Sequence, residues 1–65
     1  MTAHAIVVLV GGERVRVAAS VAEIVSALAV SYVFESLTDS FPGGDVLVSF
    51  HMRNVAYVLP VREIA

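Results

Sequence analysis

The sequence predicts a small α+β fold with the element order β-β-α-β-β-β, in which one helix covers a single small antiparallel sheet. Three observations support this prediction. Two strand-like segments flank Gly11-Gly12, a capping box at Ser20 precedes a helical apolar stripe, and further alternating segments follow a turn-rich loop at residues 38–45. All 65 residues are expected to form one domain.

The N-terminal segments predict a β-hairpin. Residues 4–10 are apolar at nearly every position, which is typical of a strand buried on both faces. The glycine pair that follows tolerates the positive φ angles that primed hairpin turns require. Residues 13–17 then alternate, with Arg14 and Arg16 on one face and Val15 and Val17 on the other. The second strand is therefore expected to be half exposed.

The middle of the chain predicts one helix followed by a strand. Ser20 and Glu23 have the spacing of a capping box, in which each side chain binds the other residue's backbone N–H. One helical stripe follows, made of Val21, Ile24, Val25 and Leu28. We expect a helix from residue 21 to about 30 and, because Tyr-Val-Phe at residues 32–34 favours a pleated surface, a strand over 31–37. Continuation of the helix to Phe34 is the competing interpretation.

The C-terminal part predicts two more strands. Residues 38–45 contain Pro42, two glycines and two aspartates, which are typical of a loop. Residues 46–52 alternate, with Val46, Val48, Phe50 and Met52 expected to point inward. A break or bulge at Arg53-Asn54 separates them from a strand at 55–59, which Pro60 places at a sheet edge. These strands are expected to form an antiparallel meander.

The composition predicts self-association. The chain is 58% hydrophobic and 15% charged, whereas soluble domains average about 45–50% and about 25%. A monomer of this size buries only about 60% of its unfolded surface, and the second face of the first strand needs a cover. We therefore expect a homo-oligomer that shares a core between subunits. The candidate interface residues are Val8, Val10, Phe41 and Tyr57.

Several classes of protein and site are disfavoured. The chain has no cysteine, which excludes disulfides and thiolate metal sites, and no cofactor is expected. No apolar run approaches the ~20 residues of a membrane span, and residues 1–5 lack the basic residues of a secretory signal. We expect a cytoplasmic protein with no membrane partner. The two glycine pairs lack the pattern of a phosphate-binding loop.

Catalytic and metal sites have little support. Ser49, His51 and Asp45 contain the residue types of a catalytic triad, but no strained turn surrounds the serine. His4 and His51 would approach each other only if their strands paired, and a metal would need further ligands from carboxylates or symmetry mates. We expect surface histidines, no catalytic residue and no enzyme.

The basic residues are four arginines in a chain of net charge −2, which has no general basic face for nucleic acid. Arg14 and Arg16 would form an anion-binding or nucleic-acid-binding strip with His51 and Arg53 if the two strands were neighbours. The favoured interpretation is that these arginines are solvated and pair with Glu13, Glu35 or Glu63, which contributes little to stability.

Residues 46–58 end in Asn54-Val55-Ala56-Tyr57-Val58. This pattern resembles that of short proteins of unknown function from actinobacteria and their phages, and is similar to small flagellar FlbD-like proteins. The resemblance implies a small accessory or mobile-element protein and transfers no catalytic residue. Arginine in place of lysine, with abundant valine and alanine, is also typical of a GC-rich coding sequence.

The leading functional hypothesis is a non-catalytic, homo-oligomeric interaction module whose partner is another macromolecule, in the first place a protein. One alternative is a nucleic-acid-binding regulator that uses the arginine strip on a symmetric assembly. Another alternative is a protein that sequesters a small ligand in pockets between subunits.

Overall fold

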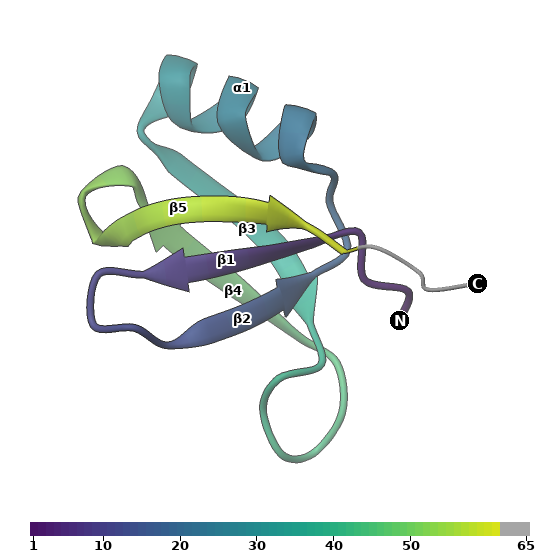
Figure 1. The fold of residues 1–65 in the computed structure, drawn as a ribbon. Helices are drawn as coiled ribbons and strands as arrows, with labels where there is room; N and C mark the ends of the chain where they lie inside the picture. The colour runs from purple at the N-terminus through teal and green to yellow at the C-terminus, as the bar shows by residue number, and fades with distance from the viewer. Residues whose placement is uncertain (62–65) are drawn as a thin grey trace.

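A computed structural model of the chain describes residues 1–61. The described elements comprise five strands, one α-helix and one 3₁₀ turn (Figure 1). In chain order they are β1 (Ala5–Leu9), β2 (Arg14–Val17), α1 (Val21–Ser31), β3 (Val33–Thr38), β4 (Val46–His51), η1 (Met52–Asn54) and β5 (Val55–Pro60). The predicted α+β class and the element order are confirmed.

The first two strands form the predicted antiparallel hairpin, in which Val7 pairs with Val15 and Ile6 with Arg16. Its loop consists of residues 10–12, because Leu9 N–H donates to Glu13 O at 2.9 Å and Gly12 N–H donates to Leu9 O at 2.9 Å. Of the two glycines, only Gly12 has a positive φ, of 95°. The turn is therefore a three-residue loop with glycine in the left-handed position, and not a two-residue primed turn.

The strands form two antiparallel sheets, which corrects the prediction of a single sheet. One sheet has the strand order β2-β1-β5, and the other pairs β3 with β4. The predicted meander is also wrong at its last step, because the 3₁₀ turn at the predicted Arg53-Asn54 break directs β5 away from β4 and onto β1. Stacking the two sheets buries one apolar face of each sheet. A single sheet covered by one helix of 11 residues would leave part of its apolar face exposed.

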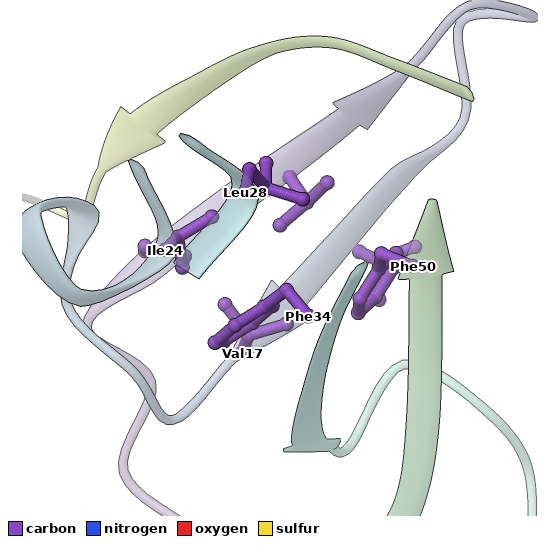
Figure 2. Close-up of a cluster of buried hydrophobic side chains, with 8 residues drawn as sticks. Val17, Ile24, Leu28, Phe34 and Phe50 are labelled. Atoms are coloured by element: carbon purple, nitrogen blue, oxygen red, sulfur yellow. The ribbon is translucent and has the colours of Figure 1, made fainter. Parts of the chain in front are cut away.

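The core lies between the two sheets and the helix (Figure 2). The three-stranded sheet, the helix and the β3–β4 hairpin all contribute to a cluster made of Ala5, Val7, Val15, Val17, Ile24, Leu28, Phe34 and Phe50. Phe34 and Phe50 are cross-strand partners whose stacked rings lie 6.3 Å apart between centroids. The inward positions predicted for Val48 and Phe50 are confirmed, whereas Val46 and Met52 are exposed.

Helix α1 begins as predicted. Ser20 Oγ accepts the Glu23 N–H at 3.2 Å and Glu23 Oε1 accepts the Ser20 N–H at 3.3 Å, so both halves of the capping box are present. The helix ends at Tyr32, which has a left-handed backbone with φ 61°. A bulky residue rarely adopts this conformation. Because β3 starts at Val33, continuation of the helix to Phe34 is excluded.

Strand β1 is buried on its core face, and on the opposite face Val8 is buried within a single chain while Ile6 is partly exposed. Ala5 and Val7 are fully buried against the core, and Val8 on the opposite face is only 4% exposed. A second subunit was expected to cover this face of the strand, but Val8 is already covered by its own chain. Over residues 1–61, no helix is long and apolar enough to cross a membrane.

Candidate interaction surface

The outer face of the three-stranded sheet combines apolar and basic side chains in two cross-strand rows. The strand registers place Val8 between Arg14 and Tyr57, and Ile6 between Arg16 and Leu59. Tyr57 is 51% exposed and Leu59 is 36% exposed, although both side chains belong to a regular strand. We call these six residues the outer face. It has an apolar centre, an aromatic and aliphatic side along β5, and a cationic side along β2.

The outer face exists because alternation places one set of residues inward and the other outward. Val15 and Val17 of β2 belong to the core, so Arg14 and Arg16 between them point away from it. On β5, Val58 packs against the core while Tyr57 and Leu59 on either side of it do not. The same period of two therefore builds the core and this exposed surface.

One of the two arginines on the outer face is tethered. Arg16 Nε lies 3.8 Å from Asp39 Oδ1, and the Arg16 backbone N–H donates to Ser40 Oγ at 2.9 Å. Both partners lie in the loop between β3 and β4, and neither is Glu13 or Glu35, which were expected to pair with the arginines; the third expected partner, Glu63, lies outside the described residues. Because Asp39 offsets part of the charge of Arg16, Arg14 supplies most of the positive charge of this face.

The four residues of the predicted anion-binding strip do not lie in one row. Arg14 and Arg16 belong to β2, whereas His51 ends β4, and these strands lie in different sheets. His51 and Arg53 instead line a shallow pocket of about 220 Å³ together with Tyr32 and Met52. The predicted strip required β2 and β4 to be neighbours, and they are not adjacent in either sheet.

Backbone hydrogen bonds hold the pocket together. Tyr32 N–H donates to Leu28 O at 3.0 Å, and Tyr32 O accepts the Met52 N–H at 2.8 Å. The end of α1 is thus fixed to the end of β4, with an aromatic ring, an imidazole, a thioether and a guanidinium around the opening. Sequence reasoning missed Tyr32 and Met52 as pocket residues, although an aromatic residue at the end of a helix without a glycine cap was a usable signal.

The remaining predicted interface residues lie outside the outer face. Val10 is 69% exposed in the β1–β2 loop, and Phe41 is 46% exposed in the β3–β4 loop. Asp39 and Ser40 of the same loop bind Arg16, so Phe41 directly follows residues that contact β2. Val8 has little accessible surface of its own because its neighbours flank it.

The structure brings together neither the possible triad of Ser49, His51 and Asp45 nor the pair of His4 and His51. Asp45 precedes β4 and lies 3.5 Å from the N-terminal amine, whereas His51 ends the same strand. At about 3.3 Å per residue, the strand separates them by roughly 20 Å. His4 precedes β1 and His51 belongs to the other sheet, so the strand pairing that a shared metal required does not occur.

Comparison with family models, with curated proteins and with solved structures finds no match for this chain.

Proposed function

We propose that this protein is a small, non-catalytic interaction module that forms homo-oligomers. It uses the outer face of its three-stranded sheet to bind a protein partner. The observation that carries the proposal is the pair of cross-strand rows formed by Ile6, Val8, Arg14, Arg16, Tyr57 and Leu59. Tyrosine and arginine are enriched in protein interfaces and lysine is depleted, and the chain contains no lysine.

The chemistry of the outer face indicates the chemistry of the partner. Tyr57 and Leu59 supply an apolar anchor region beside the buried Val8. Arg14 lies on the opposite side of the row, where an acidic group on the partner would complement it. We expect an apolar partner surface with a carboxylate at one side.

Self-association is supported by apolar surface that lies elsewhere. Val25 and Val30 of α1 are 55% and 81% exposed, and the cross-strand pair Leu37 and Leu47 is 45% and 63% exposed. These residues belong to the helix and to the two-stranded sheet, so a partner on the outer face would leave them uncovered. Apolar side chains exposed on two different elements are surface that a second copy of the chain could cover.

The proposed origin, an accessory protein of an actinobacterium or of one of its phages, rests on the arginine-only basic composition and on the C-terminal pattern around Asn54. It is consistent with an adaptor role, which requires no catalytic group.

Two measurements test the proposed function. Light scattering at micromolar concentration is expected to show a dimer or larger species, and a stable monomer would refute self-association. For the partner face, a photo-crosslinking amino acid at Tyr57 is expected to capture one defined protein in the native host, and Arg14→Glu should abolish the capture. The matched control carries the same crosslinker at Glu35, which is exposed on the other sheet. Equal capture from both positions, or capture of nucleic acid alone, would refute the proposed face.

A further inference from the structure

The four sheet edges of the described chain differ in how they are protected. β2 is short, carries two arginines, and is covered by Ser40 at Arg16 N–H. β3 contacts α1, and its Leu37 O accepts the Ala18 N–H just beyond β2 at 3.1 Å. β5 lies beside α1 and ends at Pro60 (Figure 1). Among residues 1–61, only β4 has an edge with none of these protections.

The free edge of β4 also lacks the sequence features that normally prevent pairing. Proteins protect exposed edges with charged side chains, prolines, bulges or short strands. β4 is six residues long, reads VLVSFH, contains no Asp, Glu, Lys, Arg or Pro, and pairs with β3 without a shift in register. It is therefore an edge that a further strand can extend.

The hydrogen-bonding pattern identifies which backbone groups point outward. The bond from Met52 N–H to Tyr32 O makes the next pair, Val33 and His51, a non-hydrogen-bonded pair. Hydrogen-bonded and non-hydrogen-bonded pairs alternate along an antiparallel ladder. The backbone N–H and C=O groups that face the free edge therefore belong to Leu47, Ser49 and His51, whose side chains are all exposed.

We propose that β4 pairs antiparallel with β4 of a second copy about a two-fold axis at Ser49, forming a continuous sheet of the order β3-β4-β4-β3. This inference rests on the proposed self-association and names its surface. A two-fold axis perpendicular to the sheet leaves each side chain on the same face of the sheet. Residues that pair across two strands must share a face, so one residue must pair with its own copy, and the axis passes beside that residue. Centred on Ser49, the pairing uses all three outward-facing residues of each copy, whereas centring on Val48 uses only two.

A second copy fits this edge better than an unrelated strand. Leu47 would lie opposite His51 of the second copy, and the two Ser49 residues would meet at the axis, so the strand brings no like charges together. On the other face, Val48 would lie opposite Phe50 of the second copy, which is a favourable β-branched and aromatic pair. The exposed Leu47 side chain would gain apolar contact as well. A single pair of six-residue strands would form a small interface, so we expect a reversible dimer.

The position of the axis allows a charge-complementation test. Glu35 lies directly across from Ser49 on β3, so the test is made in a Glu35→Gln background, in which Ser49→Lys and Ser49→Glu each place two like charges opposite each other at the axis. Each is expected to be monomeric by sedimentation velocity at concentrations where the Glu35→Gln protein is dimeric. An equal mixture of the two variants is expected to restore a dimer that contains one chain of each, identified by native mass spectrometry. Ser49→Thr is the matched control and should remain dimeric, since it keeps the backbone N–H and adds no charge.

The outcomes separate this inference from the proposed function. If the wild type is monomeric, self-association fails and the inference fails with it. If the Glu35→Gln protein is dimeric and its Ser49→Lys variant is equally dimeric, the proposed edge is wrong and another surface mediates association. If both charged variants are monomeric but their mixture is not restored, the axis does not lie at Ser49. Circular dichroism of each variant verifies the fold, and Ser49 is exposed in the single chain, so neither charge is buried in the monomer.

Discussion

Replacing Tyr32 by glycine should stabilise the protein relative to replacing it by alanine. Tyr32 ends α1 with φ 61° and ψ 0°, the conformation for which glycine is most suited. A left-handed backbone costs a residue with a Cβ atom about 1–2 kcal/mol. Glycine loses more conformational entropy on folding, which lowers its advantage over alanine by about 0.5–1 kcal/mol. The free energy of unfolding should therefore be about 0.5–1 kcal/mol higher for Tyr32→Gly than for Tyr32→Ala.

The comparison isolates the backbone effect because both variants remove the same ring. The Tyr32 side chain is 63% exposed, so both variants lose the same small amount of apolar contact. For a chain of this size, the difference corresponds to roughly 2–8 °C in Tm. Thermal and urea unfolding, followed by circular dichroism, should be recorded at one protein concentration because association raises apparent stability. An alanine variant as stable as the glycine variant would show that Tyr32 is not held in the left-handed region.

Two further predictions concern the helix cap and the charge of the outer face. Ser20→Ala should lower the free energy of unfolding by about 0.5–2 kcal/mol, whereas Ser26→Ala on the exposed side of α1 should have little effect; equal melting temperatures for Ser20→Ala and the wild type would mean that the cap contributes nothing. We expect no measurable binding to generic DNA or RNA at physiological salt, because the net charge is −2 and Arg16 is paired with Asp39. A complex that weakens steeply with salt and is lost in the double variant Arg14→Ser, Arg16→Ser would instead support the nucleic-acid-binding regulator.

Local sequence patterns were sufficient to predict the type and order of the elements and to place their ends to within about two residues, the largest difference being the start of β3 at Val33 and not at Ser31. The capping box at Ser20 and Glu23 and the strict alternation around Arg14 and Arg16 depend only on neighbouring residues, and the structure confirms both. The strand after the helix was predicted from the β-branched and aromatic residues at 32–34, and Val33–Thr38 is a strand. Such patterns reflect backbone conformation, which short stretches of sequence largely determine.

The pairing of the strands could not be predicted in the same way. β5 alternates whether it pairs with β4 or with β1, so its sequence does not indicate the partner. The choice depends on η1, where three residues turn the chain, and on the burial of Phe34 and Phe50 against the other sheet. For the same reason the sequence left open whether Arg53 lies beside Arg14 and Arg16, and in the structure it lines the pocket with Tyr32. Contacts between residues far apart in sequence determine both the pairing of β5 and the position of Arg53.

The two proposed surfaces have different physical requirements, and this difference is what allows both to operate in one small chain. The edge of β4 presents unpaired backbone groups, which fix the register of a second strand. The outer face presents side chains of the other sheet, on the side opposite to the core that β4 and Phe50 help to form. Pairing through β4 therefore leaves the outer face of each copy uncovered. A dimer of this kind would present two copies of the face around Tyr57, so that a partner with two matching sites would bind with higher avidity than either site alone provides.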